Sequence, residues 1–102
     1  RLYLILGTLV GKDLAAMLAA LAPLQPTIVW ATTSSHPRAR PASEVAAQAS
    51  AAGLAAETAP SVAEAMGQAM QRAQADDLVL ATGSLSVAAE ARAACGRTAL
   101  DV

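Results

Sequence analysis

The sequence predicts a three-layer α/β domain built around a mainly parallel sheet. Three segments rich in aliphatic residues, 2–6, 27–32 and 78–82, have the length and composition of β-strands. Each is followed by an alanine-rich stretch with helical spacing, and this alternation is typical of a parallel α/β sheet. The segment 27–32 is continuously apolar between its terminal threonines, which predicts a strand covered by helices on both faces of the sheet.

The first strand, residues 2–6, is followed by a loop and a helix. Gly7 ends the strand, and Asp13 can accept a hydrogen bond from the free N–H groups at the start of a helix. The apolar side chains of this helix recur every three or four residues, at Leu14, Met17, Leu18 and Leu21. Pro23 and Pro26 follow, and proline does not continue a helix. We therefore expect a first β-α unit that ends before the second strand begins.

The middle of the chain predicts a second β-α unit and a weak third strand. After strand 27–32 and the loop 33–41, Pro41 is expected as the first helical residue, because its missing N–H costs nothing there. Gly53 suits the left-handed position that ends many helices. Residues 54–58 are then expected to form a short strand.

The last third of the chain predicts two more helices around a strand. Ser61 and Glu64 have the spacing of a capping box, in which each side chain satisfies a backbone N–H of the other residue. The inward positions of this helix are Val62, Ala65, Met66, Ala69, Met70 and Ala73, with the methionines filling the core. A buried strand at 78–82 follows, and a Gly-Ser turn leads into a final helix that ends near Gly96.

Composition excludes several classes of function. The net charge is −1 and the chain has no Phe, one Trp and one Tyr, so it lacks the positive surface and stacking rings that nucleic-acid binding needs. No apolar run reaches the ~18 residues of a membrane span, and we expect a cytoplasmic domain that binds neither membrane nor nucleic acid. Cys95, the only cysteine, cannot form an internal disulfide and is expected to be a small buried residue of the last helix.

The loop 7–13 resembles a phosphate-binding loop only superficially. It joins a strand to a helix and has a glycine before Lys12, but three residues separate its glycines where a P-loop has four. Asp13 stands where a P-loop has the Ser or Thr that holds Mg²⁺, and its carboxylate would repel phosphate. We therefore expect a glycine turn followed by an Asp helix cap, with another ligand contact as the alternative.

The loop 34–41 is the first candidate binding site. It holds the only histidine, His36, and two arginines, Arg38 and Arg40, after a central strand. Ligands of open α/β sheets bind at the carboxyl ends of the strands, and an arginine can bind a carboxylate or phosphate through two hydrogen bonds. An exposed basic loop without a ligand is the alternative. No Cys, His or acidic residue is spaced to complete a metal site with His36, so no metal is expected.

The turn Gly83-Ser84 is the second candidate binding site. It ends one strand and opens a helix, so unpaired backbone N–H groups and the hydroxyls of Ser84 and Ser86 converge there and can attract an anion. Ser84 as a plain helix cap is the equally supported alternative. The turn does not have the pattern of a nucleophile elbow, because no glycine follows Ser84 two residues on and His36 is not obviously placed as its base.

Five segments, taken together and in order, resemble the C-terminal domain of folylpolyglutamate synthase/dihydrofolate synthase in the Mur ligase superfamily. They are Leu6-Gly7, Lys12-Asp13-Leu14, Pro37-Arg38-Ala39, Ser61 to Ala65 and Asp77 to Leu85, with Glu90 and Arg92 after the last. The resemblance runs from Arg1 to about Gly96. Two residues depart from it: Gly11 stands where the family usually has aspartate, and Ser86 where an aromatic residue is common.

The resemblance implies a Rossmann-like domain and a ligase activity. In the family, ATP phosphorylates a carboxylate of the folate, and the amine of L-glutamate displaces the phosphate to form an amide. The implied role of this domain is to orient glutamate and to close over an N-terminal ATPase domain that binds ATP and Mg²⁺. Gly83 and Ser84 resemble one wall of the glutamate pocket, and Arg38, with His36 beside it, resembles the loop arginine near the added amino acid. Lys12 and Asp13 match a motif whose implied role is structural.

The resemblance also implies that residues 1–102 are a single partial domain. The family's Asp-Gly-Ala-His-Asn segment and its P-loop ATPase domain would precede Arg1, so the first strand and helix of the domain are expected to be absent. We expect this piece alone to be inactive, to bind no cofactor and to self-associate through the edge left open. Two alternatives stay open: a non-catalytic α/β interaction module, such as a receiver-like domain, and a ligase that acts on a peptidoglycan precursor.

Overall fold

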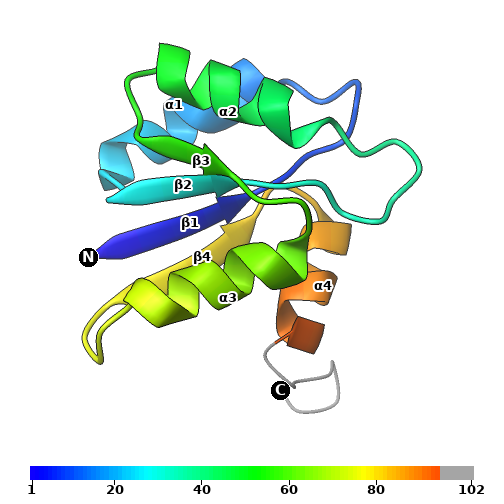
Figure 1. The fold of residues 1–102 in the computed structure, drawn as a ribbon. Helices are drawn as coiled ribbons and strands as arrows, with labels where there is room; N and C mark the ends of the chain where they lie inside the picture. Colours follow the sequence, from blue (N-terminus) through cyan, green and yellow to red (C-terminus); the bar gives the residue numbers. More distant parts are fainter. Residues whose placement is uncertain (95–102) are drawn as a thin grey trace.

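The computed structural model describes residues 1–94, and its centre is a four-stranded parallel sheet in the order β3-β2-β1-β4 (Figure 1). The strands are β1 (Leu2–Leu6), β2 (Ile28–Ala31), β3 (Ala56–Thr58) and β4 (Leu78–Thr82). The helices are α1 (Leu14–Leu21), α2 (Ala42–Ala51), α3 (Val62–Arg72) and α4 (Leu85–Ala94), with a short 3-10 turn at Ala22–Leu24. Each element lies where the sequence predicts it, with small differences at the ends.

Helices α1 and α2 cover one face of the sheet, and α3 and α4 cover the other (Figure 1). The order of the strands explains this division. The chain moves from β1 to β2 to β3 in one direction and then returns past β1 to β4. Right-handed connections place the helices of the two directions on opposite faces. The predicted three-layer, Rossmann-like α/β fold is therefore confirmed.

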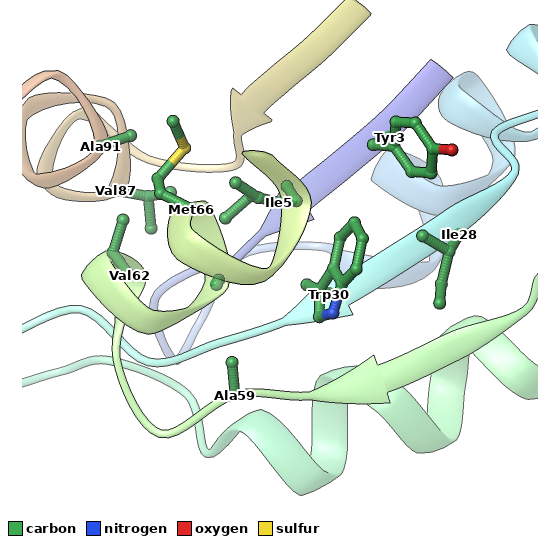
Figure 2. Packing of buried hydrophobic residues seen from close by; sticks show 11 residues of the cluster. Tyr3, Ile5, Ile28, Trp30, Ala59, Val62, Met66, Val87 and Ala91 are labelled. Carbon is green, nitrogen blue, oxygen red and sulfur yellow. The ribbon is translucent and has the colours of Figure 1, made fainter. Parts of the chain in front are cut away.

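The two faces of the sheet carry different cores. Side chains alternate along a strand, so Tyr3 points to the α3–α4 side and Leu4 to the α1–α2 side. On the α3–α4 side, the rings of Tyr3 and Trp30 lie 5.8 Å apart (Figure 2), and Trp30 Nε1 donates a 2.9 Å hydrogen bond to the side chain of Gln68. The buried cluster on the other side consists of leucine, valine and alanine, and its small alanines let the helices approach the sheet closely.

Local signals in the sequence predict the helix ends well. The Asp13 carboxylate accepts a 3.0 Å hydrogen bond from the N–H three residues further on and caps α1. The hydroxyl of Ser61 accepts a 3.1 Å bond from the N–H three residues further on and caps α3. Gly53 follows α2 with φ +86°, the left-handed conformation that was expected. Pro41 precedes α2 instead of beginning it. Its ψ of 139° is not helical, and the first helical residue is Ala42.

Strand β4 is not the buried strand that the sequence predicts. It lies at the edge of the sheet, and Leu78 and Leu80 on its α1–α2 side are 60% and 37% exposed. The reason is topological, since α1 and α2 connect β1, β2 and β3 and neither extends over β4. Met66 is buried as expected, but Met70 is 58% exposed because its side of α3 lies beside this open edge.

Two expectations, a buried Cys95 and a helix end near Gly96, lie outside the described residues. Within residues 1–94, no helix is both long and apolar enough to cross a membrane. The same residues contain no group of three or more His, Cys, Asp or Glu that could hold a metal ion.

Candidate functional site

The chain leaves β1 and β4 toward opposite faces at the carboxyl edge of the sheet. Strand β1 continues to α1 on one face, and the neighbouring β4 continues to α4 on the other (Figure 1). In open α/β sheets a crevice forms at such a switch point, and ligands bind there. The topology therefore places the candidate site among the loops after β1 and β4, together with the long loop between β2 and α2.

Two glycines let the backbone pack tightly at this switch point. Gly83 has φ +116°, and a Cβ atom at this position would collide with the carbonyl oxygen of Gly7. Gly7 is similarly enclosed, because an added Cβ would lie 2.8 Å from the backbone oxygen of Thr32 and 2.9 Å from the side chain of Val87. The ends of β1, β2 and β4 and the start of α4 therefore meet without room for further side chains.

The loops after β1 and β2 are joined by a short antiparallel backbone bridge. Two hydrogen bonds of 2.8 Å flank the paired residues Leu9 and Ala39: the Val10 N–H to the Arg38 oxygen, and the Arg40 N–H to the Thr8 oxygen. The bridge places Lys12, on the first loop, beside His36 and Arg38 on the second. Residues that are distant in the sequence thus come together at the carboxyl edge.

A cavity of about 540 Å³ lies between these two loops, and we call it the cationic cavity. It is lined by Leu9, Val10, Gly11, Lys12, His36 and Arg38. A guanidinium nitrogen of Arg38 lies 3.7 Å from the position that a Cβ of Gly11 would take, so the Arg38 side chain extends over the first loop. The described lining includes two cations and no carboxylate. An ammonium and a guanidinium at one cavity form a suitable site for a small anion such as a carboxylate.

His36 shapes the turn that carries Arg38. Its Nδ1 accepts a 3.0 Å hydrogen bond from the Arg38 N–H, and its own N–H donates to the hydroxyl of Ser34 at 3.3 Å. With Nδ1 bonded to the main chain, Nε2 is the ring nitrogen that faces a ligand or solvent.

Ser84 caps α4, which is one of the two roles that the sequence allowed. Its Oγ accepts a 3.2 Å hydrogen bond from the Val87 N–H and lies 3.0 Å from the hydroxyl of Ser86. The Ser86 hydroxyl in turn lies 2.9 Å from that of Ser34, a residue only 7% exposed. A chain of three hydroxyls therefore links the start of α4 to the loop after β2. A role for Ser84 in ligand binding stays a prediction.

The structure brings some of the predicted site residues together and keeps others apart. Lys12, His36 and Arg38 line the same cavity, although the resemblance implied a structural role for Lys12. Asp13 does serve structure, as the cap of α1. Ser84, with Gly83, lies at the switch point and is not among the described residues that line the cationic cavity.

Sequence reasoning missed the polar contacts between the loop after β2 and α4. The Ser34–Ser86 pair spans 52 positions, and Glu90 accepts hydrogen bonds of 3.1 Å from both the N–H and the hydroxyl of Ser35. Each of these residues taken alone has the pattern of a solvated serine or glutamate. Only the parallel arrangement of β2 and β4 around β1 brings the two segments close enough to bond.

The doubly wound sheet, its switch point and the adjacent cationic cavity define a Rossmann-like α/β domain with a candidate ligand site. The family model of the Mur ligase glutamate ligase domain matches residues 1–85, so the chain belongs to this family. The resemblance drawn from five short segments is thereby confirmed. Membership in this family favours the ligase interpretation over a receiver-like module. The comparison with curated protein sequences gave no match.

Solved structures of folylpolyglutamate synthases are similar to the chain. E. coli FolC in complex with DHPP and ADP is 27% identical with a TM-score of 0.84, covering 94% of this chain and 22% of that protein. Mycobacterium tuberculosis folylpolyglutamate synthase complexed with ADP and AMPPCP is 30% identical with a TM-score of 0.83, covering 94% and 24%. A bifunctional folylpolyglutamate synthase/dihydrofolate synthase with Mn, AMPPNP and L-glutamate bound is 27% identical with a TM-score of 0.74, covering 94% and 22%. The chain thus spans less than a quarter of the length of these proteins.

Proposed function

We propose that this chain is the glutamate-binding domain of an ATP-dependent ligase that joins L-glutamate to folate or dihydropteroate. Family membership and the matched synthases support this proposal, since their ligands include DHPP, ADP, AMPPNP, Mn and L-glutamate. Because the chain spans 22% of two of those proteins, we assign ATP and Mg²⁺ to an N-terminal ATPase domain of the same protein. This domain closes over that one during the reaction.

The observation that carries the proposal is the cavity lined by Lys12 and Arg38. L-Glutamate has two carboxylates, and two cations at one cavity match them in charge. The Arg38 guanidinium can bind one carboxylate through two hydrogen bonds, and the Lys12 ammonium can bind the other as a point charge. The same cations repel the amino group of glutamate and so turn it away from the loops, toward the acceptor. His36 Nε2 is the proposed neutral contact inside the cavity, and the Ser84 hydroxyl, at the switch point outside it, is the proposed contact for the part of the ligand that extends beyond the cavity.

The proposed reaction has two steps. A carboxylate oxygen of the acceptor attacks the γ-phosphorus of ATP, ADP leaves, and an acyl phosphate forms. The amine of glutamate then attacks the acyl carbon, the bond from that carbon to the phosphate oxygen breaks, and phosphate leaves as the nitrogen loses a proton. Residues of this domain contribute binding and orientation, and closure excludes the water that would hydrolyse the acyl phosphate.

A ligase assay tests this proposal on a protein that combines this domain with its ATPase domain. We expect ADP release that requires both L-glutamate and a pterin-containing acceptor such as dihydropteroate or tetrahydrofolate. ADP release with a peptidoglycan precursor in place of the pterin would contradict the folate assignment. ADP release that never depends on an amino acid would contradict the ligase function itself.

The assignment of ATP binding to another domain is tested separately. We expect calorimetry on the chain alone to detect no saturable binding of Mg-ATP in the micromolar range, because loop 7–13 does not match a P-loop. Tight, saturable binding would contradict the assignment of ATP to another domain. L-Glutamate, added at millimolar concentration to the same sample, is the matched ligand that should interact with the cationic cavity.

A further inference from the structure

We infer that Arg40 is a positioning residue for the cationic cavity, an inference that rests on the proposed function of that cavity. Arg40 is not among the described residues that line the cavity, and its side chain is only 13% exposed. Its guanidinium binds the first loop and α2 instead. Nη2 donates a 2.8 Å hydrogen bond to the main-chain oxygen of Lys12, and Nη1 pairs with the carboxylate of Glu44 in the first turn of α2.

Arg40 holds the turn that carries Lys12 at both of its ends. The Arg40 N–H donates to the oxygen of Thr8, just before the turn 9–12. The guanidinium donates to the oxygen of Lys12, the last residue of that turn. Between these points the turn is closed by a 3.2 Å bond from the Lys12 N–H to the Leu9 oxygen, and Gly11 adopts φ +94°. Two of the hydrogen bonds that place Lys12 relative to Arg38 therefore come from one residue of the second loop, Arg40.

Stability alone is a poor explanation for a guanidinium at this place. The Nε atom of Arg40 is buried and has no hydrogen-bond partner among the described residues. An unsatisfied buried donor lowers stability, and ion pairs of low exposure are often matched or exceeded by apolar side chains of similar size. A methionine would fill the same space without that penalty. What methionine lacks is the donor to the Lys12 oxygen, which is a contact between the two loops that line the cavity.

The charges around Arg40 separate a geometric effect from an electrostatic one. Glu44 pairs with Arg40, so the two residues together add no net charge near the cavity. The double substitution Arg40→Met/Glu44→Gln removes the guanidinium and its hydrogen bond to the Lys12 oxygen, and it leaves the charges of Lys12 and Arg38 unchanged. A change in glutamate binding in this variant therefore reports on the position of Lys12.

The test is steady-state kinetics of the complete ligase, with glutamate and ATP varied separately. In the Arg40→Met/Glu44→Gln variant we expect the KM for glutamate to rise about tenfold, because a displaced binding group is costly. The KM for ATP and the kcat should stay close to those of the unmodified enzyme. Arg40→Lys retains a donor within reach of the Lys12 oxygen and should recover part of the lost glutamate affinity.

The matched control is Arg72→Met, far from the cavity at the end of α3. Arg72 also pairs with a carboxylate, that of Glu57 at 3.5 Å, and stacks on the Trp30 ring at 5.8 Å. This variant should lower the melting temperature and leave the KM for glutamate unchanged. If Arg40→Met/Glu44→Gln behaves in the same way, Arg40 is only structural and the inference is wrong.

Arg38→Ala distinguishes failure of this inference from failure of the proposed function. If Arg38→Ala leaves the KM for glutamate unchanged, the cavity is not the glutamate site and the proposed function fails. If it raises that KM while Arg40→Met/Glu44→Gln does not, only the positioning role fails. Should the double variant not fold, Glu44→Ala alone removes the acceptor on one side of the guanidinium, at a side chain that is 44% exposed. That variant must then raise the KM for glutamate about twofold, and no rise would overturn the inference.

Discussion

The carboxyl edge of the sheet and the outer edge of β4 differ in what holds them together. At the carboxyl edge, a backbone bridge and the Arg40 guanidinium fix Lys12 and Arg38 around one cavity. Along β4, Leu78 and Leu80 are exposed, and a cavity of about 590 Å³ between α3, β4 and α4 has a mostly apolar lining. Directional bonds select one ligand geometry, whereas an apolar strand edge accepts any partner that covers it. We therefore assign specificity to the first region and association to the second.

Gly83 joins the two regions, and changing it should have the largest effect. An added Cβ would collide with the Gly7 oxygen, and φ +116° disfavours any side chain. Gly83→Ala should lower the free energy of unfolding by at least about 3 kcal/mol, measured by chemical denaturation. The control is Gly67→Ala within α3, where a Cβ meets nothing within 4 Å and should stabilise by about 0.5–1 kcal/mol. Equal stability of the two variants would contradict the tight junction.

Ser84 tests whether the carboxyl edge extends to the start of α4. If its hydroxyl binds glutamate, Ser84→Ala removes a hydrogen bond to a charged ligand, on the order of 1.5–3 kcal/mol. The apparent affinity for glutamate should then fall roughly ten- to a hundredfold, with the KM for ATP unchanged. As a cap alone, Ser84 would contribute about 1 kcal/mol to stability. A glutamate titration beside a melting curve decides, since a lower melting point with an unchanged KM would remove Ser84 from the binding site.

The outer edge of β4 should make the chain of 102 residues self-associate. Its strand carries no charge or proline that would discourage pairing with another strand, and Leu78 is 60% exposed. Sedimentation equilibrium should show a mass that rises with concentration. Leu78→Lys should lower association several-fold at little cost in stability, because an exposed side chain buries little area. A monomer at every concentration would contradict this role of the edge.

Asp77, just before β4, should give a small pH effect. A hydrogen bond from the Gln74 N–H holds the pKa of the Asp77 carboxyl below its ordinary value of 3.8. A carboxyl with a lowered pKa stabilises the fold above the unfolded pKa, and this contribution is lost as pH falls through the folded pKa. The melting temperature of Asp77→Asn should therefore approach that of the parent chain below pH 3.8. A difference that does not change with pH would contradict this.

Local signals in the sequence predicted most of the fold. The Asp13 and Ser61 caps depend on residues three positions apart, and strand 2–6 is delimited by its own composition and Gly7. Met70 was misplaced because its spacing fits an inward position. Its exposure depends on β4 lying at the sheet edge, which spacing within α3 does not encode.

The candidate site was predictable only in part. Arg38 and His36 attracted attention because they follow a central strand, whose carboxyl end is a general ligand site. The pairing of their loop with that of Lys12 depends on the Leu9–Ala39 bridge, and no local pattern announces a bridge between two loops. The hydrogen bond from the Arg40 guanidinium to the Lys12 oxygen joins residues 28 positions apart, and it depends on the same bridge.

The central claim is that the cationic cavity binds the glutamate that a ligase adds. Arg38→Ala in the complete enzyme tests it most directly, with the KM for glutamate measured at saturating ATP and acceptor. We expect a rise of roughly ten- to a hundredfold, corresponding to the loss of a charge-assisted contact of about 1.5–3 kcal/mol, with the KM for ATP unchanged. An unchanged KM for glutamate, in a variant that melts like the parent enzyme, would contradict the assignment of this cavity.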